Sequence, residues 1–262
     1  AARMKGFSLA AVVDISRERI DAALSMAGYT GACEYVSRMS EARAAYGRGA
    51  LVAATEWMLA VSLPHVDVVI DATGSPELGA VMSLACAEAG KHIVMMNVEC
   101  DVTVGPVLRR KAGEAGVLYT MGAGDEPAAI MELYRFADAL GFEIVAAGKG
   151  KNNPLDMTAT PATLAEKARR RSMSATMLCE FVDGSKTAIE MAAVSNATGL
   201  VPDRRGMHGA RASVADLQNV FCHRDDGGVL ERTGVVDFAI GVHPGVFLVV
   251  TTDSPRLRDS LI

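Results

Sequence analysis

VDVVIDATGSPELGAVMSLACAEAGKHIVMMNVE, residues 66–99, is the stretch that decides the fold of this chain. It begins with a short apolar run of β type, 66–70, which ends at Asp71. A helical pattern follows over 77–89, and a second apolar run covers 92–96. A strand, a helix and a strand in this order form the repeating unit of parallel sheets. The segment therefore predicts an α/β fold.

The same alternation extends over the first 147 residues. The expected strands cover 8–13, 66–70, 92–96, 117–120 and 142–147, with a weaker one around Tyr35 and Val36, and the expected helices cover 18–27, 77–89, a stretch that reaches Gly113, and 127–140. This rhythm predicts a Rossmann-type, doubly wound parallel sheet. We expect this NAD(P)-binding domain to span 1–147.

From Gly148 onward the pattern changes to irregular polar segments. Helices are expected around 163–171 and 185–197, and strands near 235–240 and 246–251. The change predicts a second, smaller α+β domain over 148–262 that carries the substrate and catalytic residues.

The first expected strand already ends in an acid, Asp14. In a dinucleotide-binding sheet, the acid that binds the adenosine ribose ends strand 2, about 20 residues after the glycine-rich turn. Strand 1 lies between strands 2 and 4 and pairs with both. We therefore expect a preceding βα unit of roughly 25 to 35 residues that contains the glycine-rich loop.

Composition narrows the range of partners. The chain has 262 residues, of which 50% are hydrophobic, and this is enough to bury a full core. Its formal charge of −5 gives no general attraction to nucleic acid or to an anionic membrane, and no apolar run approaches the roughly 18 to 20 residues of a membrane span. The five cysteines are scattered without a CxxC pair, which favours reduced thiols in a cytoplasmic protein. We expect a small-molecule partner.

Two segments are candidates for binding the nicotinamide cofactor. Asp14 favours the ribose of NAD, whereas Ser16 and Arg17 suit the 2′-phosphate of NADP, and a helix cap is the alternative role for Asp14. Thr73 and Gly74 follow a strand at the edge where open α/β sheets bind ligands. We expect them to face the nicotinamide ribose or the phosphates, and a plain turn is the alternative.

The next strand leads to Asn97 at the same edge. Asn97 is expected to face the nicotinamide and the substrate. Glu99 could face the same site or, equally well, lie in solvent. Further along, Asp125 and Glu126 precede Pro127 at the start of a helix. Adjacent carboxylates of this kind can hold Mg²⁺ or Mn²⁺. They also stabilise a helix amino end, which is the structural alternative.

The remaining candidates belong to the second expected domain. Lys149, Lys151, Asn152 and Asn153 are expected on a loop suited to a phosphate or a carbonyl oxygen, with a solvated basic turn as the alternative. Near Asp183, Lys186 and Glu190 have the i,i+4 spacing of either a surface pair or a proton-transfer site. His208, in a glycine-rich loop, is a candidate acid, base or phosphate ligand, or a structural residue.

Four segments together carry a resemblance to a known family: residues 66–105, GDEPAAI at 124–130, AAGKGKNNP at 146–154 and FVDGSKTAIEMAAVSNATGLVPD at 181–203. The chain resembles the homoserine-dehydrogenase-like oxidoreductases that include the 1-deoxy-D-xylulose 5-phosphate reductoisomerase-like enzymes of some bacteria. The resemblance covers nearly the whole chain. At Asn97-Val98-Glu99 the chain departs from the Asn-Lys-Glu of ordinary reductoisomerases.

The resemblance implies an NADPH-dependent conversion of 1-deoxy-D-xylulose 5-phosphate to 2-C-methyl-D-erythritol 4-phosphate, a step of isoprenoid precursor synthesis. It also implies a further carboxyl-terminal domain, and pairing of second domains in a homodimer is expected. Asp125 and Glu126 would act through Mg²⁺ or Mn²⁺, or Lys149 and Lys151 directly. A homoserine or related hydroxy-acid dehydrogenase that uses Lys186 and Glu190 is the alternative enzyme. A nucleotide-sensing regulator without catalysis is the alternative outside enzymes.

Overall fold

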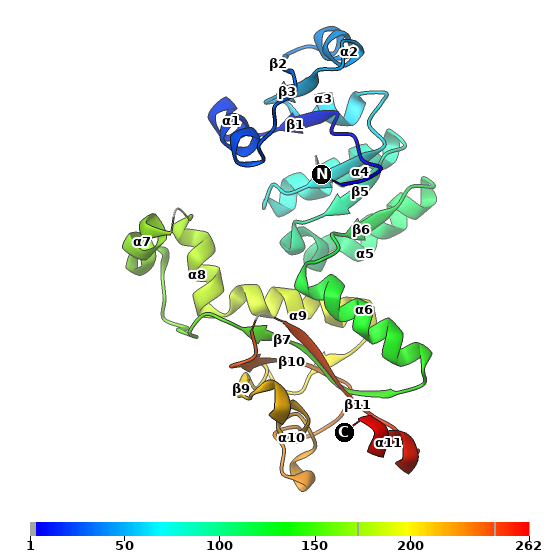
Figure 1. Ribbon diagram of the computed structural model, residues 1–262, viewed down its shortest axis with the longest axis vertical. Helices are drawn as coiled ribbons and strands as arrows, with labels where there is room; N and C mark the ends of the chain where they lie inside the picture. The colour runs from blue at the N-terminus through cyan, green and yellow to red at the C-terminus, as the bar shows by residue number, and fades with distance from the viewer. Residues whose placement is uncertain (1–3, 172, 244, 262) are drawn as a thin grey trace. The chain divides into compact units, whose positions relative to one another are not determined.

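The computed structural model describes residues 4–171, 173–243 and 245–261, and it divides into two compact units, Ala1–Met121 and Gly122–Ile262 (Figure 1). Each unit is described by itself. Both units combine helices with largely parallel strands, which confirms the predicted α/β fold class. Within the described ranges, no helix has both the length and the apolar character needed to cross a membrane.

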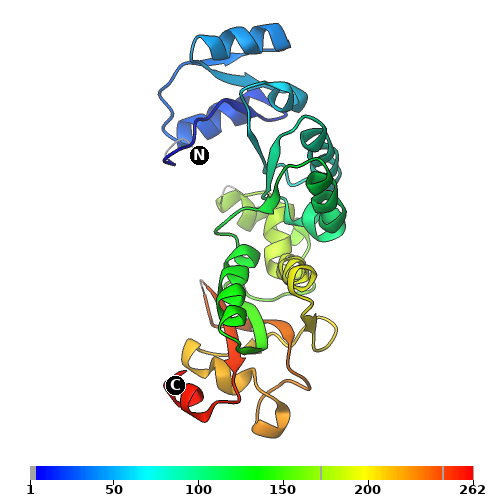
Figure 2. The same ribbon diagram turned by 90° about the vertical axis from the view of Figure 1, so that its right-hand side faces the viewer.

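The first unit contains two three-stranded parallel sheets. One has the strand order β1 (Ala11–Val13), β3 (Leu51–Ala54), β2 (Cys33–Tyr35), and the other has the order β4 (Val68–Asp71), β5 (His92–Met95), β6 (Tyr119–Met121). The helices are α1 (Arg17–Met26), α2 (Met39–Gly47), α3 (Trp57–Ser62), α4 (Pro76–Glu88) and α5 (Val98–Glu114), of which α4 and α5 pack side by side (Figures 1 and 2).

Side-chain caps fix where these helices begin. The Ser16 hydroxyl accepts a hydrogen bond from the Arg19 amide at the start of α1, and the Ser75 hydroxyl accepts one from the Leu78 amide at the start of α4. A cap of this kind satisfies one of the free amides of the first helical turn. The caps place α1 directly after β1 and α4 directly after β4, as the strand–helix rhythm of the sequence predicts.

The two sheets each have an open edge inside the unit. In the described ranges, β1 pairs only with β3, and β4 pairs only with β5. The strand expected between them from the 3-2-1-4-5-6 order stays a prediction. No strand was expected at β3, although all four of its residues are buried at the centre of the first sheet.

The second unit is built on a mixed sheet. Its strands are β7 (Glu143–Lys151), β8 (Val201–Pro202), β9 (Ala210–Arg211), β10 (Val235–Ile240) and β11 (Val246–Thr251), in the order β11-β7-β10-β8 with β9 also paired to β10. Only β11 runs antiparallel to its neighbour. The helices are α6 (Glu126–Ala139), α7 (Pro161–Arg170), α8 (Ala175–Asp183), α9 (Ser185–Thr198), α10 (Leu217–Val220) and α11 (Pro255–Leu261), with short 3₁₀ turns at Val214–Asp216 and Arg224–Asp226.

Two apolar cores form on opposite faces of this sheet. On one face, α6 and α9 contribute Ile130, Met191 and Val194, which pack with Ala147 of β7 (Figure 1). The other core contains Leu217 of α10, with residues of β7, β10 and β11. The helices of the first face bring their amino-terminal residues over the carboxyl half of β7, where the charged residues of the unit gather.

The division between the units lies earlier than the boundary expected at 147/148. The reason is that β7 continues without interruption through this point, to Lys151. Ile130 and Ala137 of α6 share a core with Ile144 and Ala147 of β7, so α6 belongs with the second sheet. The compact units consequently divide at Met121/Gly122.

Candidate functional site

The GKGK sequence of β7 separates two kinds of residue onto its two faces. A side chain at Gly148 would place its Cβ 2.3 Å from the Asp237 carbonyl oxygen, and one at Gly150 would place its Cβ 1.3 Å from the Val242 carbonyl oxygen. Backbone atoms therefore approach one face too closely for any side chain. Because residues alternate along a strand, Lys149 and Lys151 project from the opposite face, under the helices.

The expectation that these lysines lie on a loop is wrong. Lys149 pairs with Phe238 of β10 and with Val246 of β11, so it is held on both sides in the sheet. Lys151 pairs with Ile240 at the end of the same strand. The polar composition of the segment suggests a turn, but the two glycines are required by close packing and not by a bend.

Lys149 lies between two carboxylates. Its Nζ donates a hydrogen bond of 2.8 Å to Oε1 of Glu126, at the start of α6, and another to Oε2 of Glu190, on α9. The side chains of Lys149 and Glu190 are 9% and 3% exposed. Burial lowers the pKa of Lys149, but the bonds to the two carboxylates outweigh it and leave the pKa raised. The ammonium form is therefore the stable one.

The carboxylates around Lys149 differ in how readily they hold a proton. Burial is the largest cause that raises the pKa of Glu190, and burial together with neighbouring Glu126 raises the pKa of Asp125. Burial also acts on Glu126, but the hydrogen bond from Lys149 outweighs it and lowers the pKa of Glu126. The positive charge of Lys186 favours the ionised forms of Asp125 and Glu190. The cluster thus contains both proton donors and proton acceptors.

Asp125, Glu126 and Glu190 place one carboxylate oxygen each within 4.8 Å of one another, a spacing that could hold a metal ion. Oxygen ligands suit Mg²⁺ or Mn²⁺. However, the Lys149 ammonium already binds two of the three carboxylates, and a divalent cation among them would face its positive charge. With Lys149 in this position, the residues do not fit the expected metal ion.

Lys151 occupies a different environment from Lys149. Its Nζ donates a 2.5 Å hydrogen bond to the carbonyl oxygen of Phe181 on α8, and no carboxylate contacts it among the described residues. Burial and the nearby charge of Lys149 lower the pKa of Lys151, against a smaller opposing effect of Asp183. The two lysines of β7 therefore have pKa values moved in opposite directions by their surroundings. Beyond them, the amides of Asn152 and Asn153 bond to each other.

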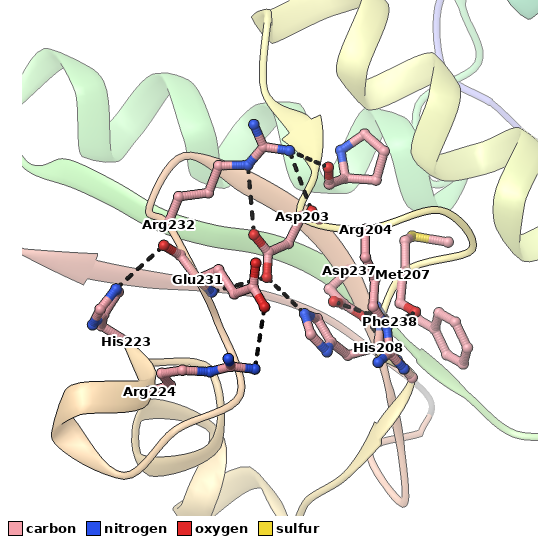
Figure 3. A network of polar contacts seen from close by, with 12 residues as sticks. Asp203, Arg204, Met207, His208, His223, Arg224, Glu231, Arg232, Asp237 and Phe238 are labelled. Atoms are coloured by element: carbon pink, nitrogen blue, oxygen red, sulfur yellow. Dashed lines mark hydrogen bonds and ion pairs between the residues drawn. The ribbon is translucent and has the colours of Figure 1, made fainter.

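The structure gives His208 a structural position (Figure 3). Its Nε2 lies 2.7 Å from Oδ2 of Asp203, which also accepts the Glu231 amide at 2.9 Å, and Nε of Arg232 lies 3.5 Å from Oδ1 of Asp203. Burial raises the pKa of Asp203, but the Glu231 amide and His208 outweigh it and lower the pKa overall. Asp203 thereby joins the loop after β8 to the loop before β10.

A second buried carboxylate, Asp237, contacts the same loop (Figure 3). Asp237 of β10 accepts hydrogen bonds from the backbone amides of His208 and Gly209. Between Asp203 and Asp237 the chain adopts left-handed conformations, including Met207 at φ 67°. Neither carboxylate is among the predicted site residues, although Asp237 stands out as an acid inside an apolar strand.

In the first unit, Asn97 is buried and fully engaged in the fold. It is 1% exposed, its Nδ2 donates to Oδ2 of Asp71 at 3.2 Å and to the carbonyl of Ser75 at 2.8 Å, and its Oδ1 accepts the Cys100 amide. These bonds tie the turn after β4 to the start of α5 and leave no donor for a substrate. The neighbouring Thr73 and Gly74 lie exposed on that turn, with Gly74 at φ 68°.

The residues expected at the adenosine end of the cofactor lie together after β1. Oδ1 of Asp14 accepts the Ser16 amide at 3.3 Å, and Ser16 begins α1. The Arg17 guanidinium lies over the Tyr35 ring of β2, 4.7 Å from its centroid. Tyr35 is a residue that the sequence pattern did not single out for binding.

Solved structures similar to the chain include several oxidoreductases and dehydrogenases, all at low sequence identity. The chain is similar to an oxidoreductase domain protein from Kribbella flavida, with 16% identity, a TM-score of 0.42 and coverage of 72% of this chain and 44% of that one. It is also similar to the WlbA dehydrogenase from Bordetella pertussis, solved with NADH and UDP-GlcNAcA, with 18% identity, a TM-score of 0.34 and coverage of 56% and 44%. The chain spans less than half the length of these structures.

No curated protein matches the chain. A family model described as "Oxidoreductase DRL, catalytic domain" matches residues 124–261. This range begins just before the Asp125–Glu126 pair and includes Lys149, Lys151 and Glu190, so it contains the whole charged cluster. The match extends over more than half of the sequence, and the chain belongs to the oxidoreductase DRL catalytic-domain family.

Proposed function

We propose that this chain is part of an NADPH-dependent oxidoreductase that acts on a phosphorylated hydroxy-ketone, converting 1-deoxy-D-xylulose 5-phosphate to 2-C-methyl-D-erythritol 4-phosphate. The observation that carries the proposal is the buried ammonium of Lys149, held between Glu126 and Glu190 and next to Lys151 on β7. A buried, oriented cation of this kind stabilises negative charge on a carbonyl oxygen. The family match supports oxidoreductase chemistry.

Lys149 would contact the reacting oxygen. An ammonium has three N–H donors, and the bonds to Glu126 and Glu190 use two of them. The third donor is available to the carbonyl oxygen of the substrate. As negative charge develops on this oxygen, the ammonium stabilises it. The paired carboxylates keep the Lys149 amine protonated until hydride has been transferred to the carbonyl carbon.

Lys151 would bind the phosphate or a second oxygen of the substrate through its ammonium group. Burial and the charge of Lys149 lower the pKa of Lys151, which makes it the easier of the two lysines to deprotonate. Lys186 and Asp125 belong to the same charged cluster, to which Lys186 contributes a positive charge and Asp125 a carboxyl. Two adjacent cations also suit a phosphate group.

The nicotinamide cofactor supplies hydride when it is bound. The residues that fit its adenosine end are Asp14, Ser16 and Arg17, which gather after β1 as in dinucleotide-binding folds. Asp14 suits a ribose hydroxyl, and Arg17 suits a 2′-phosphate. Arg17 is the reason why we propose NADPH and not NADH.

One observation favours a second function, a dehydrogenase of a small hydroxy acid or aldehyde. Rearrangement of a hydroxy-ketone requires both of its oxygens to be polarised, which a divalent cation achieves by binding both. With Lys149 between the carboxylates, the cluster does not fit such a cation. Hydride transfer alone requires only one polarised oxygen, which Lys149 can serve.

A turnover assay with the purified full-length protein tests these functions. We expect NADPH to be consumed with 1-deoxy-D-xylulose 5-phosphate, and the methylerythritol phosphate product to appear by mass spectrometry. Consumption only with aspartate semialdehyde would establish the dehydrogenase instead. A nucleotide-sensing regulator would be supported if the protein binds NADPH, as measured by fluorescence, but turns over neither substrate. The Lys149→Met variant is the control, and it should bind NADPH without turnover.

A further inference from the structure

Tyr35 makes contacts with both ends of Arg17 and with Asp21. The Arg17 guanidinium lies 4.7 Å from the centroid of the Tyr35 ring, and the Tyr35 hydroxyl lies 3.2 Å from the Arg17 carbonyl oxygen. The same hydroxyl donates a 2.6 Å hydrogen bond to Oδ1 of Asp21. Because β2 and α1 are separate elements, these contacts fix the Arg17 side chain against a strand.

Without Tyr35, Asp21 would be the natural partner of Arg17. The two residues are four apart on α1, and side chains at i and i+4 lie next to each other on a helix. An aspartate at this position can form an ion pair with the arginine when no other group engages it. In the structure the Asp21 carboxylate is engaged by the tyrosine, and no carboxylate is paired with Arg17 within the described ranges.

Two exposed arginines lie at this place, Arg17 and Arg19, and of these Arg19 is paired with a carboxylate. The Asp14 carboxylate, which would repel a phosphate, accepts the Ser16 amide at 3.3 Å and lies 3.9 Å from the Arg19 guanidinium. The bond to Asp21 raises the pKa of Tyr35 to about 12, so the phenol keeps the proton that it donates. Arg17 itself is exposed to solvent.

We propose that Tyr35 is a positioning residue that keeps Arg17 free of Asp21 and turned toward the 2′-phosphate of an adenosine nucleotide. This inference rests on the proposed NADPH-dependent function. The ring holds the guanidinium by a cation–π contact, and the hydroxyl holds the competing carboxylate. The chain thereby selects NADPH through two residues that need not both touch the nucleotide.

Two small nucleotides test the inference without the rest of the cofactor. 2′,5′-ADP carries the 2′-phosphate, AMP lacks it, and titration calorimetry of the whole chain measures both affinities. Wild-type protein should bind 2′,5′-ADP more tightly than AMP, by about tenfold for one charge-assisted contact. Arg17→Leu should abolish this preference and leave AMP binding unchanged.

The Tyr35→Phe variant keeps the ring and loses the hydroxyl. We expect it to lower the 2′,5′-ADP affinity severalfold, because Asp21 becomes free to pair with Arg17, while AMP binding stays the same. The double variant Tyr35→Phe/Asp21→Asn should restore the wild-type preference. A purely structural role for Tyr35 would not give this rescue. Tyr29→Phe is the matched control, since among the described residues the Tyr29 hydroxyl hydrogen-bonds only to the Ala32 carbonyl.

The possible failures are distinguishable. An unchanged preference in Tyr35→Phe, or no rescue by Asp21→Asn, would overturn the role of Tyr35 while leaving NADPH binding intact. If the wild type bound the two nucleotides equally, Arg17 would not contact the 2′-phosphate. If the wild type bound neither these nucleotides nor NADPH, the proposed function itself would fall. Thermal unfolding of each variant confirms that it is folded.

Discussion

Lys149 and Glu190 form an ion pair that is almost completely buried, with side chains 9% and 3% exposed. Removing both charges from water is expensive, and their mutual attraction compensates only while both partners remain. Glu126 extends the pair toward the surface, since its side chain is 41% exposed. The ion pair is thus anchored in the interior of the second unit, and Glu126 links it to the solvent-exposed surface.

Replacing Lys149 with methionine should affect stability and catalysis separately. We expect the free energy of unfolding to fall by about 3–5 kcal/mol, because Glu190 keeps a buried charge without a partner. Turnover should fall by about 10²- to 10⁴-fold. Adding Glu190→Gln should recover much of the stability, as measured by urea unfolding, but none of the turnover. Lys167→Met, on the exposed side of α7, is the control. Recovery of turnover in the double variant would contradict a chemical role for Lys149.

Metal binding should depend on the presence of Lys149. Wild-type protein is expected to bind Mn²⁺ weakly at the cluster of Asp125, Glu126 and Glu190, because the ammonium occupies two of the carboxylates. In Lys149→Met the three carboxylates lose this cation, and Mn²⁺ affinity should rise by at least about tenfold. Electron paramagnetic resonance of free Mn²⁺ measures the change. Tight binding by the wild type that disappears in Glu190→Gln would instead establish the site as a metal centre with Lys149 in place.

The alkaline limb of the activity profile should report Lys151. Burial and the charge of Lys149 lower the pKa of Lys151, so its ammonium loses its proton below the ordinary lysine value of about 10.4. If the ammonium binds the substrate, kcat/KM should decline as the pH rises through this lowered pKa. Lys151→Arg keeps a positive charge at all these pH values, and should move the decline to higher pH. An unmoved limb would assign the decline to another group.

Asp203 should stabilise the second unit in a pH-dependent way. Its pKa is lowered in the folded state, so its contribution is fully present above the unfolded value of about 3.9 and is lost as the pH falls through the folded value. Asp203→Asn should cost about 1–3 kcal/mol at neutral pH, since it removes the charge of a buried carboxylate that accepts the Glu231 amide and pairs with His208 and Arg232. The unfolding free energy of the Asp203→Asn variant should also vary less with pH than that of the wild type, in the acidic range where Asp203 is protonated. Asp225→Asn, at an exposed carboxylate, should change neither quantity.

Gly150 should tolerate no side chain. Alanine there would place its Cβ 1.3 Å from the Val242 carbonyl oxygen, so the segment after β10 would have to move away from β7. We expect the second unit to lose its cooperative thermal transition, as measured by circular dichroism. Gly113→Ala is the matched control because open space surrounds that position on α5, where alanine favours the helix by up to about 1 kcal/mol. A folded Gly150→Ala variant would show that the loop after β10 can yield.

The positions of many strands and helices follow from local pattern. The strands at Val235–Ile240 and Val246–Thr251 are where apolar runs predict them, and α4 and α9 agree with the predicted helices to within about two residues. By contrast, β3 and α2 were not expected, because a short alanine-rich strand and a weakly amphipathic helix carry little periodic signal. Asp125, Glu126, Lys149 and Lys186 could be singled out by residue type alone.

The α/β class, the βαβ order and the identity of the charged residues follow from local sequence, because they depend on periodicity and composition within short windows. The place of Lys149 in a strand between Glu126 and Glu190 follows from long-range packing, since residues 23 and 41 positions away meet it where α6 and α9 pack on one sheet. The tertiary structure likewise engages Asn97 and His208 within the fold. Burial and hydrogen bonding depend on what surrounds a side chain, and those surroundings come from distant parts of the chain.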